Sequence, residues 1–133
     1  GNHCVLANGV TLSGHVELGD QVVGGGLVGV HQFVKIGAFS MLGAGSIIIQ
    51  DVVPFVTVQG DRAKTVGLNS VGMKRNAFSS EQLQIVKRIY KRIFCSGNTI
   101  GDAIAVIETG EPASDIKEMM LEFLKTTTRG ICR

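Results

Sequence analysis

Apolar positions recur every six residues over the first 53 residues of the chain. The repeat has two columns, one of small or β-branched residues and one mostly of large aliphatic residues. Neither the period of about 3.6 of a helix nor the period of two of a simple strand produces this pattern. The first column is Cys4, Val10, Val16, Val22, Val28, Val34, Ser40, Ser46 and Val52, and the second is Leu6, Leu12, Leu18, Gly24, Val30, Ile36, Leu42 and Ile48.

A coil with three flat sides accounts for this period, because each side then consists of one short strand and one corner. Such coils stack at a strand spacing of about 4.8 Å, with aliphatic side chains along the axis and glycines at corners that a side chain would block. Residues 1–53 are therefore predicted to form a parallel β-helix; an ordinary sheet with chance alternation is the alternative. Fewer than three coils without a cap before Cys4 make a marginal stack, so we expect further coils upstream.

The six-residue period ends at Pro54. Residues 54–78 are predicted to be a connector, with a short strand at 55–58 and turns at Gly60 and Gly67. The chain is thus divided into a β-helix (1–53), this connector (54–78) and a helical domain (79–133), and it is mainly β.

Three helices are predicted over residues 79–133. Each begins at a hydroxyl side chain, and in two cases the residue three positions later completes a capping box. Methionine and aromatic residues in the last helix are interpreted as packing residues rather than as a cofactor site. The starts are Ser79 with Gln82, Thr99 with Asp102, and Ser114; the first two helices end near Gly97 and Gly110.

Composition excludes several classes of protein. The 133 residues are 44% hydrophobic, too apolar for a disordered chain, and the 18 glycines lack collagen spacing. No run of about 18 apolar residues suggests a membrane-spanning helix, and no secretory leader is visible. Gly1 in place of Met hints at a processed or truncated product. Three widely spaced cysteines favour reduced thiols in a cytoplasmic setting.

Charge is unevenly distributed along the chain. One base and three acids give residues 1–53 a net −2, whereas twelve bases and eight acids give residues 54–133 a net +4. The weak total of +2 argues against a nucleic-acid binder, which needs many clustered bases. Lys87/Lys91 and Arg88/Arg92 are four residues apart on one predicted helix, so they form either a docking face for an acidic partner or a solvated face.

Three segments, together with the repeat and the tail Thr128–Ile131, resemble the C-terminal half of the UDP-N-acetylglucosamine acyltransferase family of lipid A biosynthesis. The resemblance covers essentially the whole chain. The segments are Leu12-Ser13-Gly14-His15-Val16, Gly29-Val30-His31-Gln32-Phe33, and Gly67-Leu68-Asn69-Ser70-Val71-Gly72-Met73-Lys74-Arg75.

The resemblance implies a left-handed parallel β-helix followed by three helices, in a cytoplasmic homotrimer with active sites between neighbouring subunits. It implies transfer of a 3-hydroxyacyl chain from acyl carrier protein to the 3-hydroxyl of UDP-N-acetylglucosamine. No metal or organic cofactor is expected, because the donor brings its own phosphopantetheine. The family's general-base histidine would lie a few residues upstream of Gly1, and none of His3, His15 and His31 is expected to replace it.

His15 and His31 are 16 residues apart, two short of one coil, so we expect both at one edge of the prism beside a shared groove. Alone, a corner histidine is more often a solvated surface residue. The resemblance implies that His15, His31 and Gln32 contact substrate and that the backbone N–H of Gly14 stabilises the oxyanion. Without it, Gly14 is as well explained as a corner glycine.

The resemblance also implies that Asn69 and Arg75 contact the nucleotide sugar, and Arg suits a phosphate chemically. Val71 and Asn76 depart from the family, since an acidic and a basic residue are common there. Ala44 occupies the position of an acyl-chain ruler, which predicts shorter chains than glycine would allow, although it could merely tighten a coil. The predicted carrier-docking residues are Lys74, Lys87, Arg88, Lys91 and Arg92.

Two other functions remain open from the sequence. One is another hexapeptide-repeat transferase, either an N-acyltransferase or an acetyl-CoA-dependent enzyme. The other is a non-catalytic trimeric scaffold. Because the general-base histidine is not among these 133 residues, this is the function expected for the isolated chain.

Overall fold

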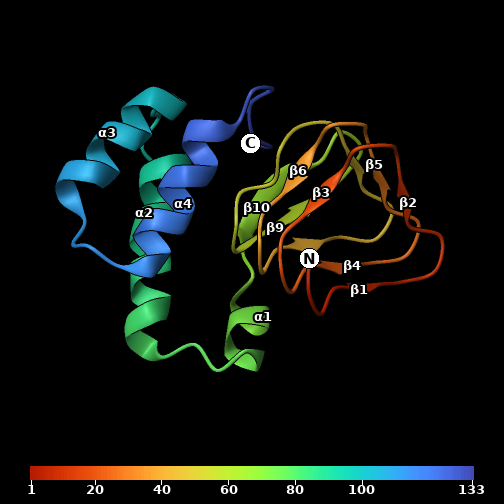
Figure 1. Cartoon of the computed structure of the whole chain (residues 1–133), viewed down its shortest axis with the longest axis horizontal. Coiled ribbons are helices and arrows are strands. Elements are labelled where there is room, and N and C mark those ends of the chain that lie inside the picture. The colour runs from red at the N-terminus through yellow and green to blue at the C-terminus, as the bar shows by residue number, and fades with distance from the viewer.

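The computed structural model describes all 133 residues, and its amino-terminal part is a triangular parallel β-helix (Figure 1). Val5 pairs in parallel with Val23, and Val23 pairs with Met41, one coil further on. The predicted six-residue repeat is therefore confirmed. The strands of the coils are β1 (Val5–Leu6), β2 (Thr11–Leu12), β3 (Glu17–Leu18), β4 (Val23–Gly24), β5 (Gly29–Val30), β6 (Lys35–Ile36), β7 (Met41–Leu42) and β8 (Ile47–Ile48).

The three faces of the prism are the sheets β1-β4-β7-β9-β10, β2-β5-β8 and β3-β6. Strand β9 (Val56–Gln59) pairs in parallel with β7, so coil pairing continues beyond residue 53. Strand β10 (Lys64–Leu68) closes the first sheet antiparallel to β9. The predicted turn at Gly60 is present (φ +106°), but the one at Gly67 is wrong, because Gly67 lies in β10 at a register irregularity.

The interior columns of the repeat form the axis of the prism. Val22, Val28 and Val34 are completely buried, and so are Leu42 and Ile48 of the second column. In the first coil the corresponding Leu6 and Leu12 are 37% and 38% exposed, because no coil covers them.

Corners of the prism do not depend on glycine in the way predicted. At several corners the left-handed residue carries a side chain, as at His15 (φ 57°) and Leu27 (φ 60°). Glycine is needed instead where successive coils approach closely: a Cβ on Gly37 would lie 2.3 Å from the nitrogen of Pro54. The glycine expectation is therefore corrected: Gly19, Gly25 and Gly37 serve coil stacking, and within residues 1–53 only Gly9 and Gly45 are glycines in the left-handed position of a turn.

Helix starts in the second half agree with the sequence prediction. Ser79 and Thr99 make complete capping boxes, and Ser114 caps the last helix. A short helix before them was not predicted and begins after Asn69. The helices are α1 (Ser70–Arg75), α2 (Ser80–Phe94), α3 (Ile100–Gly110) and α4 (Asp115–Thr126).

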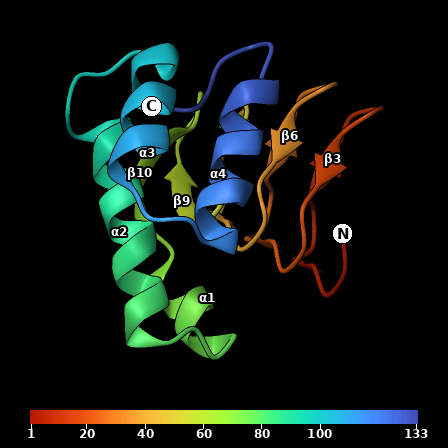
Figure 2. The ribbon, with the colours of Figure 1, turned by 60° about the vertical axis from the view of Figure 1, so that its left-hand side comes forward.

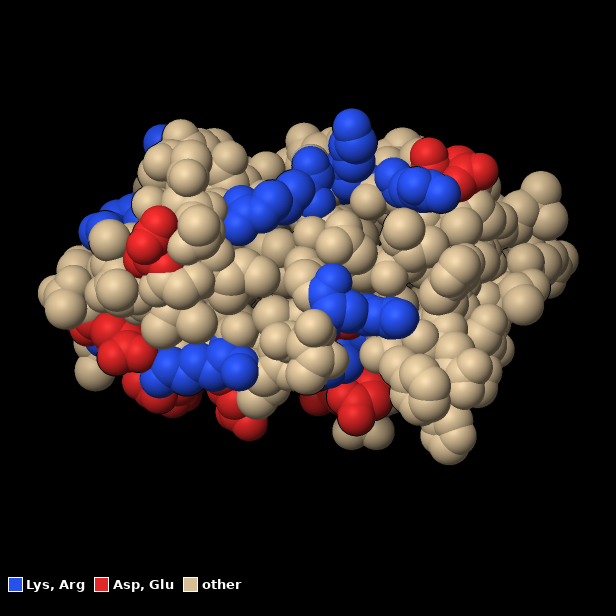
Figure 3. Space-filling model, turned by 90° about the horizontal axis from the view of Figure 1, so that it is seen from above, with Lys and Arg blue, Asp and Glu red and all other residues tan.

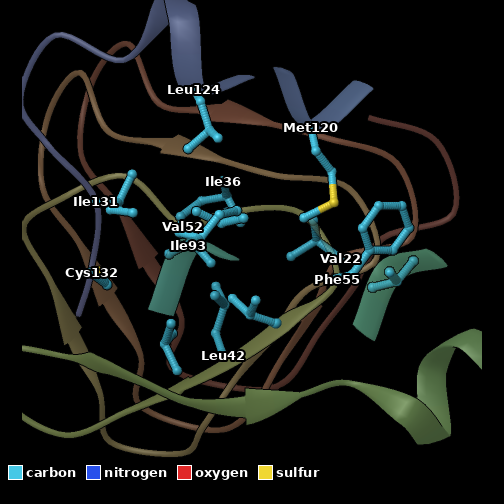
Figure 4. Close-up of a cluster of buried hydrophobic side chains, with 14 of the residues drawn as sticks. Val22, Ile36, Leu42, Val52, Phe55, Ile93, Met120, Leu124, Ile131 and Cys132 are labelled. Atoms are coloured by element: carbon cyan, nitrogen blue, oxygen red, sulfur yellow. The ribbon is translucent and has the colours of Figure 1, made fainter. Parts of the chain in front are cut away.

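Helices and prism share one hydrophobic core. Helix α4 lies beside β6 (Figure 2), where the Lys35 ammonium sits 5.0 Å above the ring of Phe123. Val52 of the third coil, Ile93 of α2 and Met120 of α4 belong to a single buried cluster (Figure 4). No helix has both the length and the apolar character needed to cross a membrane.

Candidate functional site

An open groove of about 610 Å³ runs along the outer side of the β1-β4-β7-β9 face, next to α1. Its floor consists of outward side chains that alternate with the interior column, such as Val23 and Met41. It is also lined by residues 68–72 with Arg75 and Asn76, and by His3 and Gln21. Arg75 is the only Lys, Arg, Asp or Glu in this lining, so the groove favours an anionic ligand.

Asn69 is held in the wall of this groove by its own hydrogen bonds. Its side-chain oxygen caps α1 by accepting from Gly72 N at 3.1 Å, and its Nδ2 donates to the carbonyl of Phe39 at 2.9 Å. A Cβ on Gly72 would lie 2.3 Å from Nδ2 of Asn69, so glycine is required beside it. Asn69 thus joins α1 to the turn that leads into β7, with one amide hydrogen left for a ligand.

Three residues of α1 and its C-terminal end, Val71, Arg75 and Asn76, line the groove. The Arg75 side chain is exposed and forms no ion pair. Asn76 turns back and donates from Nδ2 to the carbonyl of Gly72 at 2.8 Å. Val71 is 62% exposed. The groove therefore holds one fixed positive charge without a neighbouring carboxylate.

His15 and His31 lie at a different corner, which we call the histidine corner and define as residues 13–16 and 31–34. The register of β2 with β5 stacks these two turns on successive coils, as the spacing predicts. The imidazole of His15 stacks on Phe33, with 5.3 Å between ring centroids and 8° between planes. His31 lies two residues earlier in the second turn and is exposed.

Gly14 presents an unobstructed backbone at the histidine corner. Its N–H has no hydrogen-bond partner in the chain, and a Cβ there would meet no atom within 4 Å. The N–H of Gln32 one coil later is equally free, so the backbone permits an oxyanion role at either position. An open hollow of about 660 Å³ adjoins this corner, lined by His15, Val16, Glu17, Phe33, Lys35, Thr126 and Thr128.

Within one chain, the predicted site residues do not gather in one place. Asn69 and Arg75 line the groove, whereas His15, His31 and Gln32 occupy the histidine corner. Ala44 lies exposed at the third corner, between β7 and β8, where its carbonyl accepts from Nε2 of Gln59 at 3.0 Å.

Two of the five predicted docking residues form ion pairs with a buried carboxylate. Arg88 and Arg92 donate from Nε to the two carboxylate oxygens of Glu111, at 3.1 and 2.9 Å. The Arg88 side chain is still 48% exposed and that of Arg92 34%, so carrier docking at these two residues stays a prediction. Lys74, Lys87 and Lys91 remain exposed without an ion pair. In Figure 3, Lys and Arg gather over the helices and their junction with the prism.

Sequence reasoning missed three residues that shape these surfaces. His3 and Gln21 face the groove from successive coils, and their spacing of one coil was a usable signal. Glu111 gave no signal, because its partners lie 19 and 23 residues earlier on another helix.

Comparison with known proteins agrees with this architecture. Residues 51–132 match the family described as Udp N-acetylglucosamine O-acyltransferase, domain 2. An acyl-[acyl-carrier-protein]–UDP-N-acetylglucosamine O-acyltransferase of Thiobacillus denitrificans is 41% identical over all of this chain and 52% of its own length. The chain therefore spans about half the length of such relatives.

Solved structures give the same result. LpxA from Acinetobacter baumannii superposes with a TM-score of 0.93 at 39% identity, over 98% of this chain and 51% of its own. The UDP-N-acetylglucosamine acyltransferase of Campylobacter jejuni has a TM-score of 0.89 at 40% identity, with the same coverage. With a family match over more than half of its residues, the chain belongs to the UDP-N-acetylglucosamine O-acyltransferase family.

Proposed function

We propose that this chain carries part of an O-acyltransferase that moves a 3-hydroxyacyl group from acyl carrier protein to the 3-hydroxyl of UDP-N-acetylglucosamine. The groove is the observation that supports this most directly. Its wall is formed by residues inside the family match, and its one formal charge, on Arg75, suits a diphosphate. The three unpaired cysteines fit a cytoplasmic protein.

The reaction needs a base and an oxyanion donor. The sugar hydroxyl attacks the thioester carbonyl and loses its proton to the base, and the C–S bond then breaks to release the phosphopantetheine thiol. A free N–H at Gly14 supplies a donor of the required kind, worth about 3 kcal/mol in comparable sites. The base itself is proposed to be a histidine preceding Gly1, so the 133-residue chain alone is expected to bind substrates without turning them over.

A homotrimer would complete the site. The groove and the histidine corner occupy different edges of one prism, so neither alone offers both a phosphate-binding residue and the paired imidazoles. Apposition of the groove of one subunit with the histidine corner of the next would bring Arg75, His15, His31 and Gln32 around one sugar nucleotide.

Carrier-protein docking is proposed for Lys74, Lys87 and Lys91. These ammonium groups are exposed and unpaired, so they are free to attract an acidic partner. Arg88 and Arg92 add positive charge near these lysines. Reversing their charge would break the ion pairs with Glu111, so it would change stability as well as carrier binding.

Ala44 is proposed to limit the acyl chain, because its methyl group takes space that glycine leaves free. We expect Ala44→Gly in the active protein to shift the preferred donor toward longer chains. Mass spectrometry of products from a mixture of donors measures this, and an unchanged or shorter preference would refute the ruler.

A fusion tests the main proposal. The amino-terminal half of the Thiobacillus denitrificans relative is joined ahead of this chain in the register of the six-residue repeat. With 3-hydroxyacyl carrier protein and UDP-N-acetylglucosamine, the fusion is expected to form acylated sugar nucleotide, and the 133-residue chain alone is not. Arg75→Gln in the fusion should raise KM for the sugar nucleotide about 10-fold or more, because a charge-assisted bond is lost.

Arg62→Gln is the matched control, since Arg62 is exposed and lies outside the groove. Product formed from acetyl-CoA instead would identify another hexapeptide transferase. A folded, trimeric fusion that consumes no donor would leave the scaffold function standing and sink this proposal.

A further inference from the structure

The carboxyl-terminal segment Thr127–Cys132 lies against the third coil at the position where the next turn of the histidine corner would stand. Asp51 forms a parallel bridge with Ile131: its N–H donates to the carbonyl of Gly130 at 3.0 Å, and its carbonyl accepts from the N–H of Cys132 at 2.8 Å. The segment thus acts as an added strand on the coil stack, although it follows α4 in the sequence.

Asp51 fixes this segment to the coil below it. Its side chain is buried, with one carboxylate oxygen accepting from the N–H of Lys35 at 2.9 Å and the other from the hydroxyl of Thr127. Both oxygens of a buried carboxylate are therefore satisfied, one by the second coil and one by the tail. The tail is held firmly enough to carry a side chain to a defined place.

Arg129 is the side chain that the tail carries back to the histidine corner. Its Nη1 donates to the carbonyl of Gln32 at 2.6 Å, across 97 residues of sequence. Its own carbonyl accepts from Nε2 of Gln50 at 3.2 Å. The guanidinium therefore reaches past the third coil to a turn of the second coil.

Gln32 is connected to the imidazole of His15 through the next residue, Phe33. Its carbonyl belongs to the peptide bond that enters Phe33, a residue in the left-handed region with φ 68°. That backbone conformation is uncommon for residues other than glycine. The hydrogen bond from Arg129 to the adjoining peptide therefore helps to hold it. The ring of Phe33 in turn stacks on His15.

We propose that Arg129 is a positioning residue, which holds the Gln32–Phe33 peptide and through the Phe33 ring fixes the orientation of His15. Arg129 itself touches neither the groove nor His15. Its effect on catalysis rests on the function proposed above, whereas its effect on the His15 ring does not.

Nuclear magnetic resonance of the 133-residue chain tests the geometric part. A stacked Phe33 ring shifts the His15 ring protons upfield, and His15→Gln identifies those signals. Phe33→Leu gives the value without stacking, because Leu27 already adopts the same backbone region at an equivalent corner. We expect Arg129→Gln to remove most of the upfield shift, and Arg129→Lys, which keeps a charged donor, to restore part of it.

Arg133→Gln is the control for loss of an arginine from the same tail. Arg133 also donates to backbone carbonyls, but to Ile93 at 3.0 Å and Asn98 at 3.1 Å in the helical part. An unchanged His15 shift in Arg129→Gln, or an equal loss in Arg133→Gln, overturns the proposal. If Arg129→Gln does not fold, the test uses the unmodified chain. A nuclear Overhauser effect between an Arg129 guanidinium proton and the Phe33 amide proton supports the hydrogen bond. A guanidinium proton that exchanges freely with water refutes it.

The kinetic part uses the fusion described above. Arg129→Gln is expected to lower kcat/KM about 10-fold by misplacing His15, and Arg133→Gln is expected to leave it unchanged. A lost ring shift with unchanged kinetics would show that His15 has no role in the reaction, and would leave the positioning itself standing.

Discussion

Single residues at the corners of the prism have backbone conformations that most side chains avoid. His15, Leu27 and Phe33 all lie in the left-handed region, at a cost of about 1 kcal/mol each. Stacked coils impose this conformation, because bonds between coils flank the turn: before His15 the N–H of Ser13 donates to the carbonyl of Val30, and after it the N–H of Glu17 donates to the carbonyl of Val34. Corner side chains are consequently displayed outward at fixed heights along the prism.

Cys132 is the residue whose ionisation the fold changes most clearly. Burial raises the pKa of its thiol from the usual value near 9 to about 11, with a smaller raising effect from the Asp51 carboxylate. The folded chain thus holds this proton more tightly than the unfolded chain. Cys132 therefore stabilises the fold fully below pH 9, and this contribution is lost as the pH rises toward 11.

Urea unfolding measures this effect. Between pH 9 and pH 11 the unfolding free energy of the unmodified chain should fall by about 2 kcal/mol more than that of Cys132→Val. Cys95→Val is the control, because Cys95 is exposed. Equal pH dependence of the unmodified chain and Cys132→Val would contradict the prediction.

Secondary-structure elements are joined by a few buried polar contacts. Glu111 follows α3, and its side chain is only 1% exposed while it binds Arg88 and Arg92 of α2. Its backbone carbonyl also accepts from Nζ of Lys117 at 2.8 Å, which joins α4 to the same point. One carboxylate thus fixes the connection between α3 and α4 on the side of α2.

Glu111→Gln should lower the unfolding free energy by about 2 kcal/mol, because two charge-assisted bonds to a buried carboxylate are weakened. Glu108→Gln offers the matched control: Glu108 pairs with Lys125 on the surface, with both side chains about half exposed. That change should cost about 0.5 kcal/mol or less. Urea titrations compare the two, and equal losses would show that the buried clamp contributes no more than a surface pair.

At the scale of the whole molecule, the prism and the helices form one cooperative unit. The 25 buried apolar residues are a single cluster that runs from Val22 in the coils to Leu124 in α4. Such a shared core predicts that both parts unfold together.

Met120→Ala should lower the unfolding free energy by about 3 kcal/mol and shift both parts equally, since Met120 is completely buried where they meet. Fluorescence of Tyr90, the only tyrosine, reports on α2, and the methyl signals of Ile48 report on the prism. Met119→Ala, at a 38% exposed neighbour, should cost less than about 1 kcal/mol. Two separate transitions would contradict the shared core.

Periodic and local features of this protein were determined by the sequence itself. The six-residue columns specify three faces and a register, because each interior side chain has an equivalent one coil later. The helix caps at Ser79, Thr99 and Ser114 depend on hydrogen bonds to residues three positions away, so they too could be predicted from the sequence. The shared corner of His15 and His31 followed from coil arithmetic alone.

Contacts across large separations were decided only by the tertiary structure. No local sequence pattern predicts that Arg88 and Arg92 pair with Glu111. None predicts that Asn69 donates to the carbonyl of Phe39, or Arg129 to that of Gln32. The first two pairs depend on how α2 and α3 pack against each other, and the other two on how α1 and the tail pack against the prism. A repeat predicts its own neighbours because its period recurs, whereas a single polar side chain finds its partner only after the surrounding elements have been placed.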